Sequence, residues 1–388
     1  MRRKNLVVVL GTVFFLLVVA TLPLGWVGLS EAKSTSMKPS MITWATYDIG
    51  STTYIQAQAV AEGIYKKAGV KIRILPLGND MSRMDACRVG IAKFFITGSS
   101  PYFGRRAEAD WAAVEWGPQQ IRAIWQVAGQ RKSAFAVATQ GKSGIKVPKD
   151  LKGKKIGFVV GSRPINILSE AVLAFAGLTW DDVQIVEFPY TKTMYQGIRD
   201  GRVDAGPTAS MGSFMYELAA KPGGISWVEM DPQDTEGWAR AKAVYPPVRP
   251  ILCEHGAGLK GNPMNLVTVP HPGTYCYVGT DEELVYWQTK LIGESYDAYK
   301  DISGQMPWWH KDGLFGSIPY APWHKGAIRY FKELGIWTSE LETINQQEIE
   351  RDRRLRKLWD ASLDEALEKG IKAGKWKKFW LNKLSTFK

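Results

Sequence analysis

Two short turns combine glycine with hydroxyl side chains, a combination that binds anions when it begins a helix. One is Gly50-Ser51-Thr52-Thr53 and the other is Gly161-Ser162-Arg163. Free N–H groups at a helix N-terminus attract negative charge, and an arginine can hold a carboxylate through two hydrogen bonds. The alternative is that both turns are only helix caps, because serine and threonine are common there. Since each turn belongs to a different series of strands and helices, we expect the two turns to share one ligand cleft.

Sequence motifs typical of enzymes are either incomplete or lack the secondary structure that they require. Gly256–Gly261 (GAGLKG) has the glycine spacing of a dinucleotide-binding loop, but Pro263 and a β-branched run follow where a helix is needed. Ala136–Ser143 (AVATQGKS) lacks the first glycine of a phosphate-binding loop. Neither HExxH nor GxSxG occurs, and the four histidines are scattered: His255, His271, His310 and His324. We therefore expect no catalytic residue, no cofactor and no metal site.

The two turns follow predicted strands and precede predicted helices. Ile42–Thr46 is predicted as the strand before the first turn, and the helix after it has apolar residues at i, i+3, i+4 and i+7 until Gly69. Ile156–Val160 is predicted as the strand before the second turn, and its helix runs to Ala176. This alternation predicts an α/β fold with mostly parallel sheets and helices on both faces. At 388 residues the chain is too long for one core, so we expect two lobes.

Other elements are expected further along the chain. They are a strand at Val203–Ala205, a helix at Ser210–Ala219, a helix at Asp281–Lys300 and an amphipathic helix near Ala321–Leu334.

The N-terminus resembles an export signal. Arg2, Arg3 and Lys4 precede an apolar run from Leu6 to Leu24, and Ser30-Glu31-Ala32 resembles a cleavage site. The run is long for a signal and barely long enough to span a bilayer, so an uncleaved anchor is the alternative. In either case we expect the chain in the periplasm or on the extracytoplasmic face.

The positive charge of the chain indicates which kinds of partner it could bind. The net charge is +12, and from Ile371 onward there are six lysines and no acidic residue. A basic chain favours anionic ligands, acidic partners or a lipid surface without choosing among them. The basic C-terminal helices are interpreted as a solvated amphipathic tail, with contact to a membrane surface or a permease as the alternative.

Cys253 and Cys276 could form a disulfide in an oxidising compartment, which leaves Cys87 unpaired.

Several segments resemble the TAXI family of solute-binding receptors, which serve TRAP-type transporters. The resemblance covers roughly residues 41–338. It rests on these segments: Thr46–Tyr54 (TYDIGSTTY), Asp150–Gly161 (DLKGKKIGFVVG), Gly197–Ala205 (GIRDGRVDA), Asp281–Lys290 (DEELVYWQTK) and Ile318–Ile336 (IPYAPWHKGAIRYFKELGI).

The resemblance implies a two-lobed type II periplasmic-binding-protein fold with a ligand cleft between the lobes. It also implies capture of a small organic-acid or amino-acid-like solute, delivery to TRAP-type permease subunits, no catalysis and no nucleic acid. The expected order is a signal or anchor (1–32), a linker (33–40), a discontinuous first lobe (41–130 with 245–339), a second lobe (131–244) and a charged helical extension (340–388).

The resemblance also assigns ligand-binding residues to both sides of the cleft. One side is expected to consist of Gly50, Ser51, Thr52, Thr53 and Tyr54, together with Thr46. The other side is expected to consist of Gly161, Ser162, Arg163 and Asn166. This sequence departs from the family pattern at Asp48 and Ile49, where glycines are usual, and at Arg163–Asn166, where a Gly/Ser/Thr series is usual. Arg163 therefore leads to the hypothesis of a larger or more acidic solute.

Three alternatives to a TRAP receptor stay open from the sequence. A receptor for an ATP-driven importer shares the same fold. An exported enzyme on that fold is disfavoured because no nucleophile or base constellation is present. A surface sensor that binds a solute without importing it is favoured if the N-terminal segment stays uncleaved.

Overall fold

The computed structural model describes residues 39–127, 132–316 and 320–387. The predicted signal or anchor over 1–32 lies outside these residues, and so does the predicted linker up to residue 38. Within the described ranges, no helix has both the length and the apolar character needed to cross a membrane.

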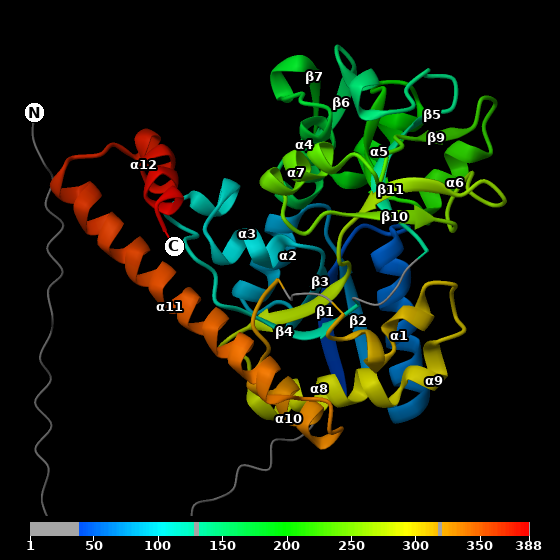
Figure 1. The fold of residues 1–388 in the computed structure, drawn as a ribbon. Coiled ribbons are helices and arrows are strands. Elements are labelled where there is room, and N and C mark those ends of the chain that lie inside the picture. The colour runs from blue at the N-terminus through cyan, green and yellow to red at the C-terminus, as the bar shows by residue number, and fades with distance from the viewer. Residues whose placement is uncertain (1–38, 128–131, 317–319, 388) are drawn as a thin grey trace, which may run out of the picture. The chain divides into compact units, whose positions relative to one another are not determined.

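The first lobe is built on a five-stranded sheet in the order β2-β1-β3-β12-β4 (Figure 1). β1 pairs in parallel with β2 and β3, whereas β12 is antiparallel to both β3 and β4. Four strands therefore point in one direction and β12 in the other. The strands are β1 (Met41–Thr46), β2 (Lys71–Pro76), β3 (Phe94–Thr97), β4 (Ile121–Gln126) and β12 (Gly273–Tyr277).

The helices of the first lobe begin and end at recognisable signals. Ser51 caps α1 by accepting a hydrogen bond from the Tyr54 amide, and Gly69 ends the helix with a left-handed φ of 69°. The predicted helix over Asp281–Lys300 is instead two helices, α8 and α9, separated at Ser295. The helices are α1 (Thr52–Ala68), α2 (Asp80–Arg88), α3 (Ser100–Arg105), α8 (Glu282–Glu294), α9 (Tyr296–Tyr299) and α10 (Lys325–Glu333).

The second lobe repeats this plan with the order β7-β6-β8-β5-β9. β6 is parallel to β7 and β8, while β5 is antiparallel to its neighbours β8 and β9. The strands are β5 (Phe135–Gln140), β6 (Lys155–Val159), β7 (Gln184–Phe188), β8 (Ala205–Ala209) and β9 (Ile225–Trp227). The helices are α4 (Arg163–Phe175), α5 (Thr191–Arg199), α6 (Ser213–Ala219) and α7 (Thr235–Val244). A separate antiparallel pair consists of β10 (Arg249–Cys253) and β11 (Met264–Thr268).

The predicted fold class is confirmed, although two predicted elements of the second lobe are displaced. Both lobes are α/β, and each sheet has a single strand, β12 or β5, that runs against the others. The strand predicted at Val203–Ala205 lies later, at Ala205–Ala209, and α6 begins at Ser213 rather than Ser210. Pro207 argues against a strand from sequence, but β6 pairs with β8 only at Ala205, so the missing N–H of Pro207 costs no bond to β6. The predicted domain boundaries stay predictions.

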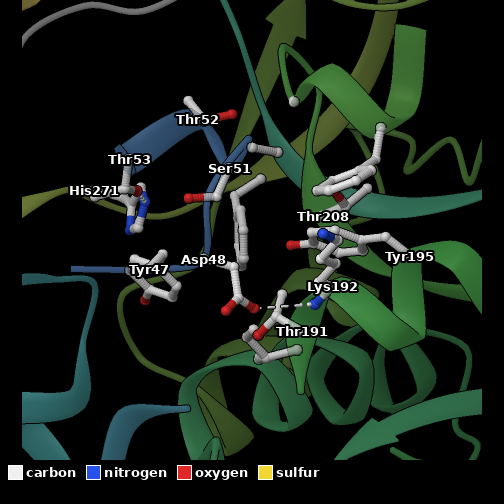
Figure 2. A pocket seen from close by; sticks show the side chains of 15 residues that line it. Tyr47, Asp48, Ser51, Thr52, Thr53, Thr191, Lys192, Tyr195, Thr208 and His271 are labelled. Carbon is white, nitrogen blue, oxygen red and sulfur yellow. Dashed lines mark hydrogen bonds between the residues drawn. The ribbon is translucent and has the colours of Figure 1, made fainter. Parts of the chain in front are cut away.

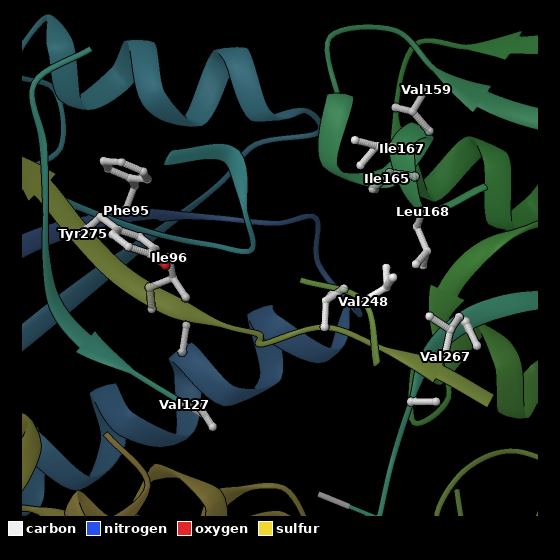
Figure 3. Close-up of a cluster of buried hydrophobic side chains, with 14 of the residues drawn as sticks. Phe95, Ile96, Val127, Val159, Ile165, Ile167, Leu168, Val248, Val267 and Tyr275 are labelled. Carbon is white, nitrogen blue, oxygen red and sulfur yellow. The ribbon is translucent and has the colours of Figure 1, made fainter. Parts of the chain in front are cut away.

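One hydrophobic cluster extends through both lobes (Figure 3). Phe95, Ile96 and Tyr275 belong to the first lobe, and Val159 and Leu168 belong to the second. Val248 and Val267 join the same cluster from the segment that includes β10 and β11. The lobes are thus connected by apolar packing as well as by the chain itself.

The C-terminal extension packs on the first lobe. It consists of α11 (Ser339–Glu368) and α12 (Ala373–Ser385), which turns back from the end of α11 toward α3 in Figure 1. The buried carboxylate of Asp352 in α11 accepts hydrogen bonds from Arg105 at 2.7 Å and Arg122 at 2.9 Å. The indoles of Trp376 and Trp380 in α12 donate to the carbonyls of Ala112 and Ala107, each at 2.8 Å. One face of the extension therefore packs on the first lobe, and only the opposite face is solvated as predicted.

All three cysteines are free thiols. Cys253 and Cys276 are both buried, and Cys87 is partly exposed. The disulfide that the sequence left open between Cys253 and Cys276 is absent from the structure.

Candidate ligand-binding site

The N-terminus of α1 presents unpaired polar groups to the space between the lobes. Ser51 caps the Tyr54 amide at 3.1 Å, whereas no hydrogen bond engages the amides of Thr52 and Thr53 within the described part of the chain. The Oγ1 atom of Thr52 is buried and has no partner among the described residues. A buried hydroxyl without a hydrogen bond is costly, so this group is well placed to bind a ligand atom.

A small cavity lies against this helix end, between the two lobes (Figure 2). Its volume is about 30 Å³, which is room for one or two water molecules. The first lobe contributes Tyr47, Asp48, Ser51, Thr52, Thr53 and His271. The second lobe contributes Phe135, Ile165, Thr191, Lys192, Tyr195, Thr208, Ala209, Gly212 and Phe214.

Asp48 and Lys192 are the two permanently charged residues in the described lining of the cavity. The backbone amide of Lys192 donates to the Asp48 carboxylate at 3.4 Å, which places a carboxylate at the N-terminus of α5 and joins the lobes (Figure 2). Burial raises the pKa of Tyr195, so its phenol stays protonated at neutral pH. The cavity therefore contains one negative group, one positive group and several hydroxyl groups.

Aromatic rings form much of the wall. The rings of Phe135 and His271 stack with centroids 5.5 Å apart and an interplanar angle of 17°. Thr53 Oγ1 lies 2.8 Å from His271 Nε2 and fixes the position of the imidazole. Tyr47 contacts His271 edge-on, with ring centroids 5.8 Å apart. Such walls favour a solute with an apolar or flat surface.

Three residues predicted on the first-lobe side lie near the cavity without lining it. Thr46 is fully buried at the end of β1, and its hydroxyl has no partner among the described residues. The Gly50 carbonyl accepts a hydrogen bond from Ser213 of the second lobe, and its φ of 86° suits glycine. The Tyr54 hydroxyl accepts a bond from Gln58 on the same helix, at 2.7 Å.

The four residues predicted on the second-lobe side do not line the cavity either. The Gly161 carbonyl accepts a bond from the Asp80 amide at 3.2 Å, and Ser162 donates to the Asp80 carboxylate. Arg163 forms an ion pair with Glu170 of its own helix at 2.6 Å. The Asn166 side chain binds the Val159 amide at 2.9 Å and the Val159 carbonyl at 2.8 Å. This turn follows its strand as expected, but its polar groups are used within the protein, and their role in binding a ligand stays a prediction.

Asp80 is the acceptor at this second contact between the lobes. Its side chain is fully buried and also accepts bonds from Arg83 at 2.6 Å and Thr97 at 3.0 Å. Burial by itself would raise the pKa of Asp80, but the Arg83 guanidinium and the hydroxyls of Ser100 and Ser162 lower it below its usual value. The Arg83 guanidinium lies 3.6 Å from the centre of the Tyr47 ring, and Tyr47 lines the cavity. Arg83 thus links the Asp80 contact to a residue that lines the cavity.

Sequence reasoning missed the contributions of α5 and of His271. Thr191, Lys192 and Tyr195 lie in the first turns of α5, just after β7. Ligands of open α/β sheets bind beyond the carboxyl ends of strands, so the position after β7 was the available signal. The turn there, Pro189-Tyr190, has no glycine or serine to attract attention. In the described ranges, no group of three or more His, Cys, Asp or Glu side chains is arranged to hold a metal ion.

Several solved structures are similar to this chain at low sequence identity. The alkanesulfonate-binding protein SsuA from Xanthomonas axonopodis pv. citri bound to MOPS is 15% identical, with 82% of this chain and 94% of that chain covered and a TM-score of 0.46. The periplasmic aliphatic sulphonate binding protein SsuA from Escherichia coli is 16% identical, with coverage of 84% and 94% and a TM-score of 0.43. A periplasmic binding protein from Brucella ovis with glutathione bound is 12% identical, with coverage of 67% for both chains and a TM-score of 0.41. Such values support no conclusion about what this chain binds.

A family assignment comes from sequence. No curated protein matches the chain. The model of the NMT1-like family matches residues 98–335, which include all strands of the second lobe and the reversed strand β12 of the first. The chain therefore belongs to the NMT1-like family.

Proposed function

We propose that the protein is an extracytoplasmic receptor that binds a small anionic solute between its lobes and delivers it to a membrane permease. The observation that carries this proposal is the N-terminus of α1, where Thr52 and Thr53, whose amides have no partner among the described residues, line a cavity with Lys192 on its other side. A carboxylate or sulfonate would satisfy these donors. The proposed role includes no catalytic step, and turnover of a bound solute would contradict it.

Binding in this proposal requires the lobes to separate and close again. The cavity of about 30 Å³ is too small for an organic acid, so the solute enters a more open arrangement. Polar contacts between the lobes then restore the closed arrangement, among them Asp48 with Lys192, Gly50 with Ser213 and Asp80 with Ser162. A solute that contacts both lobes binds the closed form more tightly than the open form and therefore stabilises the closed form.

The finer proposal is that the permease belongs to the TRAP class and that the chain is a TAXI-type receptor. It rests on the resemblance of segments such as Asp281–Lys290 and Ile318–Ile336. An ATP-driven importer is equally compatible with the fold. Uptake by the reconstituted receptor and its co-encoded permease separates them, because TRAP transport requires an ion gradient and an importer requires ATP.

We also propose that the basic face of α12 contacts an anionic membrane surface near the permease. Lysines on this face are exposed and have no ion-pair partner in the described part of the chain: Lys372, Lys375, Lys377 and Lys378. The apolar side of α12 is already used against the first lobe through Trp376 and Trp380. The contact would therefore be electrostatic rather than an insertion of apolar side chains.

A binding screen tests the proposed function. The purified chain is screened against carboxylates, amino acids and sulfonates by thermal shift, and solutes that bind are measured by isothermal titration calorimetry. Lys192→Gln removes the positive charge from the cavity and should weaken the best solute at least tenfold, because a charge-assisted bond contributes about 1.5–3 kcal/mol. Lys242→Gln, at an exposed lysine of α7 outside the cavity, is the matched control and should bind normally. If no anion binds, or if both variants bind equally well, the proposal fails.

A further inference from the structure

A second, smaller cavity adjoins the first. Its volume is about 20 Å³. Four residues line both cavities, namely Thr52, Phe135, Ala209 and His271. The remaining lining consists of Gln56, Ser133, Ala134, Met211, Thr268, Val269, Gln305 and Trp308. We call the cavity at Lys192 the head chamber and this one the tail chamber.

The shared residues form the partition between the two chambers, and the Phe135 ring is its movable part. Ala209 is paired with Phe135 in the β5–β8 ladder, so its small side chain is fixed by the sheet. His271 is held by Thr53 at 2.8 Å. A phenyl ring has no hydrogen bond to hold it, and Phe135 is only half-buried at the first position of β5. Its stacking on His271 therefore keeps the chambers apart.

The two chambers differ in charge. The permanently charged side chains, Asp48 and Lys192, line the head chamber. Among the described residues, the tail chamber is lined by amides, hydroxyls, apolar groups and the imidazole of His271, and by no Asp, Glu, Lys or Arg. Gln56 and Gln305 are hydrogen-bonded to each other, and Trp309 donates to Gln56 at 3.0 Å, so these polar groups are already engaged. A charged group in the tail chamber would lose its hydration without gaining an ionic partner.

We propose that the solute is an elongated monoanion, whose charged head binds in the head chamber and whose uncharged tail enters the tail chamber when Phe135 turns aside. Thr52, whose hydroxyl has no partner among the described residues, lines both chambers, so we expect head and tail to meet beside it. Phe135 then sets the length of solute that fits. This inference rests on the proposed function, and it excludes solutes with a second charge at the far end.

Titration calorimetry with straight-chain acids tests the inference. The probes are butanoate, hexanoate and octanoate, with succinate, adipate and suberate as dicarboxylates of matched length. We expect the wild-type chain to bind each monocarboxylate at least tenfold more tightly than its dicarboxylate. Phe135→Ala opens the partition and should improve octanoate relative to butanoate by tenfold or more, since burying each further methylene favours binding. Phe135→Leu should shift the preference in the same direction by a smaller factor.

The experiment has a matched control variant, and its outcomes separate a failure of the proposed function from a failure of the tail chamber. Phe158→Ala removes a half-buried ring of β6 that contacts Trp180 and lines neither chamber, so it should leave the length preference unchanged. A wild-type chain that binds none of the acids, nor any anion of the wider screen, overturns the proposed function together with this inference. Binding with the same length preference in wild type and both Phe135 variants overturns only the tail chamber. Equal affinity for monocarboxylates and dicarboxylates also overturns it.

Discussion

A single hydroxyl group, that of Thr52, distinguishes a ligand site from a helix cap. A cap residue satisfies the helix it begins, as Ser51 does, whereas Thr52 Oγ1 is buried beside the same helix end without a partner. Thr46 and Ser169 also have buried hydroxyls without a partner among the described residues, but of these three only Thr52 lines the cavity. We therefore expect the hydroxyl to lower the stability of the empty protein and to contribute to the affinity for a solute.

Replacing Thr52 by valine tests this double role. Thr52→Val keeps the shape and removes the hydroxyl, so the free energy of unfolding of the empty protein should rise by about 1 kcal/mol. The affinity for a solute found in the screen should fall about tenfold, because a bond to a charged group is lost. Urea denaturation and titration calorimetry measure the two effects.

The control for this substitution is Thr289→Val. Thr289 is also buried, but its hydroxyl donates to the Val285 carbonyl at 2.7 Å. Its removal should bring no gain in stability and no change in affinity. A Thr52→Val protein that is neither more stable nor weaker in binding would mean that the hydroxyl has no role at the site.

Residue chemistry alone predicted some of the residues that line the cavity and could not predict the others. Ser51, Thr52 and Thr53 carry a local signal, since glycine and hydroxyls at a helix start are typical of helix caps and of anion sites. Lys192 carries none, because a lysine in the first turn of a helix is ordinary on a surface. His271 lies far from Thr53 in the chain, and only the folded structure brings the two within 2.8 Å.

At the scale of elements, the turn between β6 and α4 binds the other lobe. Gly161 and Ser162 contact Asp80 at the start of α2, so a helix start on one lobe meets a turn on the other. The sequence predicted the position of this turn at the end of its strand. It could not predict the partner, because the pattern of glycine and serine is the same for an anion and for a buried aspartate.

Removing the hydroxyl at this contact should favour the open arrangement. Ser162→Ala leaves one oxygen of the buried Asp80 carboxylate without its bond, and a hydrogen bond to a charged group contributes about 1.5–3 kcal/mol. We expect a larger radius of gyration by small-angle scattering. Solute affinity should fall about tenfold, because closure of the open form around the solute no longer gains this bond.

Ser169→Ala is the control for that experiment. Ser169 lies on the same helix α4 and is also buried, but its hydroxyl has no partner among the described residues. The change should leave the radius of gyration and the affinity as they are. An unchanged radius in Ser162→Ala as well would show that this contact does not control closure.

At the scale of the whole chain, the alternation of strands and helices was enough to predict two α/β lobes, but not the placement of α11 and α12. The apolar periodicity of each strand and helix is local, so it can be read without knowing the neighbours. Asp352, in contrast, lies more than two hundred residues from Arg105 and Arg122 along the chain, and nothing local marks it as buried. A charged helix was therefore interpreted as a solvated tail.

Neutralising Asp352 tests whether the extension is part of the folded unit. Asp352→Asn leaves two largely buried arginines without their shared carboxylate, and breaking a buried ion pair costs about 3–5 kcal/mol. Arg105 keeps Glu348 at 2.9 Å, so the lower end of this range is expected. Urea denaturation of the full chain measures the loss.

The control is Asp360→Asn, which removes an exposed partner of Arg356 and should cost less than about 1 kcal/mol. Equal stability of both variants would identify the extension as an independent appendage.

The small volume of the head chamber has a consequence for the speed of uptake. A chamber with room for one or two waters admits no organic acid, so every capture event has to wait until the lobes part. In rapid mixing, the observed association rate should then stop increasing with solute concentration and level off at the rate of opening. Delivery to the permease would face the same limit in reverse, which makes the opening rate the quantity that sets the maximum flux through the receptor.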